Sequence, residues 1–228
     1  MKIAVRGGHC PNVTGASALI DELKEDRLVK NAIIKYLNQM GVSVLDVTPP
    51  DTTSSSSADL SYGVDKANNW GADLFVSIHF NKAYSTYNGA LGTEVCVYSE
   101  NEVAGRVVNG LASLGFKNRG QKVRTGLYEL KNTKMKSMII EVCFVEATED
   151  VALYKKLGPD TIGKAVAEAI ANKKVVEVST ASTAPSNQGE TYYRVVAGSY
   201  KDRENAEERK RQLEAKGFTG VFLEAIKK

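Results

Sequence analysis

The chain contains only two histidines, His9 and His79, and each follows a short apolar segment that ends in a polar turn. The first apolar segment spans residues 2–5 and the second lies within residues 73–78. Short apolar segments separated by a helical pattern predict strands of a parallel sheet, whose carboxyl ends form the usual ligand crevice. One histidine at a strand end is more often structural than functional. Here both histidines of the chain follow apolar segments and glutamates lie nearby, which favours a metal site.

An acidic segment, residues 21–26, follows the His9 loop and begins the first predicted helix. Catalytic zinc sites often combine two histidines with a carboxylate and leave a fourth position for water or substrate. Glu22 and Glu25 are three residues apart on one helix face, so their spacing leaves both open as the third ligand. Either could instead be an ordinary first-turn acid that complements the helix dipole.

Glu141 interrupts the apolar segment of residues 138–145. A carboxylate buried there is costly unless a cation or a proton compensates it. A metal-activated water would provide that compensation, and the structural alternative is an ion pair with Arg6 or Arg124. The sequence therefore offers Glu141 as an acid/base that takes a proton from the water and passes it to a leaving amine, while the metal polarises the scissile carbonyl.

The elements that must position these residues alternate along the chain. Helical spacing of apolar residues predicts helices over residues 23–40, 60–70, 101–114 and 161–172. Apolar segments predict strands at residues 2–5, 42–47, 73–79, 92–98 and 137–145. Strands that alternate with helices indicate an α/β fold, with a mostly parallel sheet covered by helices on both faces.

Residues 176–190 show no periodicity and have little to bury, so they are interpreted as a flexible linker. The linker separates a catalytic domain, residues 1–175, from a small module, residues 191–228. The module is expected to be a βαβ unit, with elements at residues 192–200, 202–216 and 221–226.

The composition of the chain argues against several classes of function. The formal net charge of +3 is too small for charge-driven nucleic-acid binding. No segment approaches the roughly 18 apolar residues of a membrane span, and the first ten residues lack the apolar region of a signal peptide. The three cysteines, Cys10, Cys96 and Cys143, have no CxxC spacing, which argues against a disulfide framework or a thiolate zinc site.

Taken in order, the motifs resemble the zinc-dependent N-acetylmuramoyl-L-alanine amidases of the type-3 family. The resemblance covers residues 1–172 and rests on Gly8-His9, the acidic helix start, Ser-Ile-His-Phe-Asn at residues 77–81, and Ile-Glu-Val-Cys-Phe-Val at residues 140–145. It implies a three-layer, six-stranded α/β/α fold and a bound Zn²⁺. It also implies hydrolysis of the amide between N-acetylmuramic acid and L-alanine in peptidoglycan.

By this resemblance the two histidines are zinc ligands and Glu141 is the catalytic acid/base. Glu25 is preferred as the third ligand, because the segment that it begins is similar to the family's Glu-led helix start. Glu22 is the alternative. Asn81 is a candidate substrate contact.

The small module resembles the sporulation-related repeat, a peptidoglycan-binding unit, at residues 193–200, 205–207 and 216–218. A full repeat is about twice as long, and half of one would leave a strand edge unpaired, so pairing of two copies as a homodimer is a hypothesis. An amidase with a wall-binding tail and no signal peptide resembles phage endolysins. We therefore expect synthesis in the host cytoplasm and action on the wall after release, with a bacterial autolysin as the competing assignment.

Two other functions stay open at this point. A cysteine-dependent peptidoglycan amidase or endopeptidase would use Cys10 or Cys143 with a histidine. A catalytically inactive wall-binding protein would keep the zinc site only as a remnant.

Overall fold

The computed structural model describes residues 1–176, 196–217 and 221–223. The chain divides into two compact units, Met1–Val178 and Ser179–Lys228. Each unit is described by itself. No helix among the described residues is long and apolar enough to cross a lipid bilayer.

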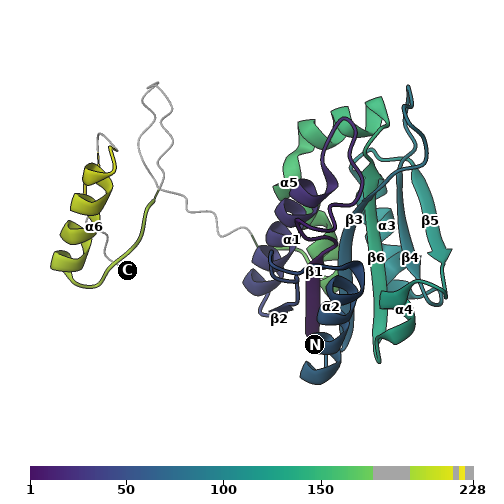
Figure 1. Cartoon of the computed structure of the whole chain (residues 1–228), viewed down its shortest axis with the longest axis horizontal. Coiled ribbons are helices and arrows are strands. Elements are labelled where there is room, and N and C mark those ends of the chain that lie inside the picture. The colour runs from purple at the N-terminus through teal and green to yellow at the C-terminus, as the bar shows by residue number, and fades with distance from the viewer. Residues whose placement is uncertain (177–195, 218–220, 224–228) are drawn as a thin grey trace. The chain divides into compact units, whose positions relative to one another are not determined.

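The first unit is built on a six-stranded sheet in the order β2-β1-β3-β6-β4-β5 (Figure 1). The strands are β1 (Lys2–Gly7), β2 (Ser43–Asp46), β3 (Leu74–Asn81), β4 (Thr93–Val97), β5 (Asn118–Val123) and β6 (Lys136–Phe144). All neighbouring strands are parallel except β4 and β6. The expected mostly parallel, six-stranded α/β fold is therefore confirmed.

Helices cover both faces of this sheet (Figure 1). They are α1 (Glu22–Gln39), α2 (Ser56–Trp70), α3 (Glu102–Ser113), α4 (Tyr128–Asn132) and α5 (Thr148–Ala171). Helices α1, α3 and α5 bury the main core with alternate strand residues such as Val76 and Ile140. Helices α2 and α4 cover part of the opposite face, where Phe75 and Ile139 lie in two smaller clusters.

Local sequence explains where α1 and α2 begin. The Asp21 side chain accepts a hydrogen bond from the backbone N–H of Lys24 and so caps α1. Ser55 caps α2 in the same way, through the N–H of Ala58. Side-chain oxygens at these positions satisfy helix N–H groups that have no partner within the helix.

Two elements were not anticipated from the sequence, and a third begins earlier than predicted. Edge strand β5 consists largely of polar residues that are only partly buried, so it lacks the apolar pattern of a buried strand. Helix α4 has only five residues. Helix α5 begins well before the predicted residue 161, because Gly158 has a φ of +75° and Pro159 follows it, which breaks the periodicity between its two halves.

Strand direction decides where the side chains of interest meet. Strands β1, β3 and β6 run parallel, so their carboxyl ends lie at one edge of the sheet. His9 follows β1, His79 lies near the end of β3, and Glu141 lies near the end of β6. Strand β4 runs in the opposite direction, so its carboxyl end lies at the other edge.

The second unit contains α6 (Arg203–Ala215), which agrees with the predicted charged helix and has no buried residue among those described. The described parts of the two expected strands, residues 196–200 and 221–223, are not in strand conformation. The rest of both expected strands lies outside the described residues. In the part that the structure describes, the helix of the expected βαβ unit is present, and its two strands stay a prediction.

Candidate metal centre

His9 is held in place by its own loop. The backbone N–H of Gly8 donates to the carbonyl of Ile78 at 2.9 Å, which ties the end of β1 to β3. Nδ1 of His9 lies 3.0 Å from the carbonyl oxygen of Val13 and donates to it, since a carbonyl can only accept. The other ring nitrogen, Nε2, lies 3.1 Å from Oε1 of Glu22.

His79 reaches the same carboxylate oxygen from β3. Its Nδ1 lies 3.0 Å from Oε1 of Glu22, and its ring meets the ring of His9 edge to face at a centroid distance of 4.8 Å. The side chains of His9 and His79 are 18% and 15% exposed, so a small solute can reach them. Burial lowers the pKa of His79, but the nearby carboxylates of Glu22, Glu141 and Glu129 outweigh this effect and raise it to about 9.

Glu22 is the residue that both histidines share. Its Oε1 also accepts the backbone N–H of Phe80 at 3.0 Å, and its Oε2 accepts the N–H of Ala16. Burial opposes ionisation, but the hydrogen bonds with the two histidines outweigh it and hold the pKa of Glu22 well below its usual range. One ligand atom from each of His9, Glu22 and His79 lies within 4.8 Å of the others.

The structure separates the two candidate acids. Glu25 lies one helical turn further along α1, and its Oε2 accepts a hydrogen bond from the hydroxyl of Tyr154 at 2.7 Å. Its carboxylate therefore turns toward α5, although Glu22 and Glu25 share one helix face. The geometry favours Glu22, the alternative, over the preferred Glu25.

Glu141 lies beside the cluster, on the neighbouring strand. It pairs with His79 in the register of β6 and β3, and its Oε2 is buried without a hydrogen-bond partner. Burial raises the pKa of Glu141 to about 7, and the carboxylates of Glu22 and Glu94 add to the increase against the opposing effect of His79. Glu141 forms no ion pair within the described part of the chain.

The alternative ion pair of Glu141 with Arg6 is not formed. Arg6 instead pairs with Asp59 at 2.6 Å and with Glu129 at 3.0 Å. Arg124 lies close to Cys96. Among the described residues, no salt bridge therefore explains why the carboxylate of Glu141 lies within an apolar segment.

One further charged residue adjoins Glu141 and was missed from the sequence. Glu94 on β4 pairs directly with Glu141 across the antiparallel strands. Its carboxylate accepts from Arg119 at 2.7 Å and from the side-chain amide of Asn81 at 3.1 Å. Glu94 stands within the apolar segment of β4, which is the same signal that identified Glu141. The amide of Asn81, the candidate substrate contact, is thus directed at Glu94.

The donor set fits a zinc ion. Two imidazole nitrogens and one carboxylate oxygen converge from three elements, which matches the three protein ligands of many catalytic zinc sites. The buried Oε2 of Glu141 adds a polar atom that lacks a protein partner.

The thiols do not form a nucleophilic centre. All three cysteines are buried, and burial raises the pKa of each thiol, most strongly for Cys143. Cys10 donates to the carbonyl of Thr53 rather than to a histidine. A nucleophilic cysteine needs a lowered pKa, so these environments are the opposite of activating.

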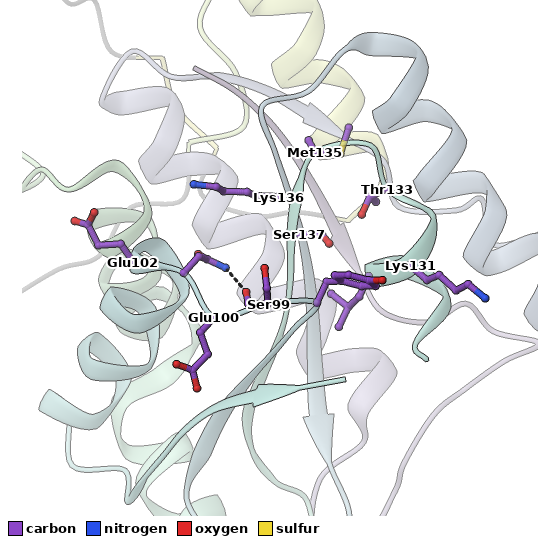
Figure 2. A pocket seen from close by; sticks show the side chains of 11 residues that line it. Ser99, Glu100, Glu102, Lys131, Thr133, Met135, Lys136 and Ser137 are labelled. Carbon is purple, nitrogen blue, oxygen red and sulfur yellow. Dashed lines mark hydrogen bonds between the residues drawn. The ribbon is translucent and has the colours of Figure 1, made fainter. Parts of the chain in front are cut away.

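A separate hollow lies between the end of β4 and the start of β6 (Figure 2). Its lining includes Ser99, Glu102, Lys131 and Lys136. None of its lining residues belongs to the His9–Glu22–His79 cluster, and the carboxyl end of β4 lies at the opposite edge of the sheet from that cluster. The hollow is therefore not part of the metal centre.

The comparison with known proteins agrees with this fold. The family of N-acetylmuramoyl-L-alanine amidases matches residues 3–172, and the chain belongs to this family. A SPOR domain also matches, over residues 163–224, so the chain carries a SPOR-like module at its carboxyl end. The two matches overlap at residues 163–172, where α5 buries Val166 and Ile170 in the main core, so this stretch is structurally part of the first unit.

The relatives of this chain include an uncharacterized protein and a named amidase. An uncharacterized protein of Clostridium perfringens (strain 13 / Type A) is 50% identical over 182 residues, which is 78% of this chain and 53% of that protein. The chain thus spans about half the length of this relative. The N-acetylmuramoyl-L-alanine amidase CwlM of Bacillus licheniformis is 28% identical over 98% of this chain and 85% of its own length.

Among solved structures, the catalytic domain of the CD27L endolysin targeting Clostridia difficile superposes with a TM-score of 0.69 at 28% identity. The match covers 77% of this chain and 99% of that domain. It therefore corresponds to the first unit.

Proposed function

We propose that this protein hydrolyses the amide between N-acetylmuramic acid and L-alanine in peptidoglycan and that it depends on zinc. The observation that carries the proposal is the convergence of His9, Glu22 and His79 within 4.8 Å, with Glu141 paired to His79 on the next strand. Membership of the amidase family supports the choice of substrate.

His9 through Nε2, Glu22 and His79 through Nδ1 would hold the metal. When bound, Zn²⁺ would polarise the scissile carbonyl and lower the pKa of water. The protein's own contribution is to orient these ligands. The carbonyl oxygen of Val13 fixes the ring of His9, and the backbone N–H groups of Ala16 and Phe80 fix the carboxylate of Glu22.

Glu141 would act as the general base and then as the general acid. Its pKa of about 7 suits both roles near neutral pH, because a proton carrier works best when its pKa lies near the operating pH. In its ionised form it takes a proton from the attacking water. In its protonated form it gives that proton to the leaving nitrogen of L-alanine, so that the amine departs neutral.

The SPOR-like module would bring the catalytic unit to its polymeric substrate. This role rests on the domain match and on the peptidoglycan-binding family that the segment resembles. The homodimer hypothesis gains no support from the described residues. Action on the wall after release stays a prediction, with similarity to the endolysin of Bacillus phage SPP1, 29% identical over 160 residues, in its favour.

The test is digestion of purified peptidoglycan with assays for new amino groups and for new reducing sugars. We expect amino groups alone, with L-alanine as the new amino terminus, lost on chelation and restored by zinc. Release that resists chelators but is stopped by thiol alkylation would move the chemistry to a cysteine. Binding to walls without any release would identify a wall-binding protein and overturn the proposal.

A further inference from the structure

A chain of hydrogen bonds leads from the ring of His79 away from the metal centre and into the protein. The hydroxyl of Ser77 donates to Oε1 of Glu129 at 3.2 Å, and the oxygen of the same hydroxyl lies 3.1 Å from Nε2 of His79. Because the Ser77 proton is given to Glu129, its oxygen is free to accept the proton on Nε2. In a neutral His79 the unprotonated nitrogen is then Nδ1, which is the nitrogen that faces Glu22.

Glu129 is firmly placed at the far end of this chain. It lies in α4 and its side chain is only 2% exposed. Its Oε1 is 3.0 Å from Nη1 of Arg6, and its Oε2 is 3.9 Å from Nε2 of His79. Arg6 is fully buried and also pairs with Asp59. The carboxylates of Asp59 and Glu129 and the single guanidinium of Arg6 together carry one formal negative charge, which lies next to the ring of His79.

The surrounding backbone is adapted to Arg6. Its guanidinium donates to the carbonyl oxygens of Gly7, Gly8 and Asp59. A Cβ at position 63 in α2 would lie 3.0 Å from Cδ of Arg6 and 3.2 Å from Nη1, so Gly63 makes room for this side chain. A buried arginine with this many partners is a rigid support for Glu129.

We propose that Ser77 and Glu129 are positioning residues for the metal, which set the proton on Nε2 of His79 and so aim Nδ1 at the ion. The inference rests on the proposed zinc site. Histidines that bind metals usually donate their other N–H to a carboxylate, carbonyl or water, and removing that partner typically costs about 10–100-fold in metal affinity or activity. His9 is arranged in the opposite sense, with Nδ1 donating to Val13 and Nε2 facing Glu22.

The first test is the zinc affinity of the full chain, measured by competition with a fluorescent chelator. We expect Ser77→Ala and Glu129→Gln each to weaken zinc binding by about 10–100-fold. Ser77→Ala leaves the Arg6–Glu129 pair intact, so it remains informative if Glu129→Gln fails to fold. Glu146→Gln is the matched control, because Glu146 is an equally buried carboxylate that accepts from backbone N–H groups and contacts none of these residues. Its zinc affinity should be unchanged.

The second test reads the position of the proton directly. With only two histidines in the chain, NMR of isotope-labelled histidine in the zinc-loaded protein should show one ring protonated on Nε2 and the other on Nδ1. The Nε2 proton of His79 should exchange slowly with water in the parent chain and rapidly in Ser77→Ala. A proton on Nδ1 of His79, or unchanged zinc affinity in both variants, would overturn the inference alone. A parent chain that binds no zinc would overturn the proposed function, and the inference with it.

Discussion

Glu141 and His79 are directly paired residues on adjacent parallel strands, and both stand on the sheet face opposite the main core, which contains their neighbours Ile78 and Ile140. This pairing places a buried carboxylate oxygen with no protein partner beside the candidate metal ligands. Glu141 and the candidate metal ligands therefore share one edge of the sheet.

Replacing Glu141 by glutamine should nearly abolish hydrolysis and leave zinc binding intact. Glutamine keeps the size of the side chain but cannot carry the proton, and general acid–base catalysis typically contributes about 10²–10⁴-fold. The measurement is the rate of amino-group release from peptidoglycan, together with bound zinc. Glu149→Gln, at an exposed position in α5, should keep the parent rate. A Glu141→Gln protein with the parent rate would remove Glu141 from the mechanism.

Glutamine substitutions at the two helix-start acids should separate their roles. Glu22→Gln should weaken zinc binding, because it removes the anionic group between His9 and His79. The loss should be at least about 10–100-fold, which is the typical cost of removing a residue that only supports a metal ligand. Glu25→Gln should leave zinc affinity unchanged and cost about 1 kcal/mol of stability through its weaker bond to Tyr154. The opposite ranking in a zinc competition assay would restore Glu25 as the ligand.

An alanine at position 8 should displace His79. A Cβ on Gly8 would lie 2.3 Å from Cε1 of that ring, and Gly8 has no positive φ, so the expected effect comes from the clash and not from backbone strain. Overpacking of this kind costs about 1–3 kcal/mol. We expect a lower melting temperature and weaker zinc binding. Gly126→Ala is the control, since a Cβ at position 126 would meet nothing within 4 Å, and equal behaviour of the two variants would contradict the packing argument.

Asp26 should make the metal-free protein less stable as pH rises. It is fully buried, neither carboxylate oxygen has a hydrogen-bond partner, and burial raises its pKa from 3.8 to about 7. Between these values the unfolded chain has lost the proton while the folded chain still binds it. This contribution therefore destabilises the folded state progressively from about pH 4 to pH 7 and stays constant above that range.

Asp26→Asn should remove this dependence. Its gain in unfolding free energy over the parent should be near zero at about pH 4 and reach at most about 4 kcal/mol at about pH 8. Urea unfolding in the presence of a chelator measures the difference at each pH and removes the influence of bound metal. A gain that does not change with pH would show that Asp26 titrates normally in the folded protein.

Much of the site could be predicted because its signals are local. His9, His79 and Glu141 each stand at or within an apolar strand segment, and parallel strands bring such positions to one edge. Strand β5 carried no such signal, because an edge strand can be polar on both faces. Glu129 carried none either, since it lies in a five-residue helix between two loops.

The sequence by itself determined the α/β class and singled out the two histidines and Glu141 as candidates, because apolar periodicity and a carboxylate in an apolar segment are properties of neighbouring residues. Only the tertiary structure favours Glu22 over Glu25, because their spacing places both on one helix face and the packing of α1 determines which carboxylate meets the strand ends. It also decided that Arg6 pairs with Glu129 and Asp59 rather than with Glu141. These partners are distant in sequence and meet only when α2 and α4 pack on the same face of the sheet.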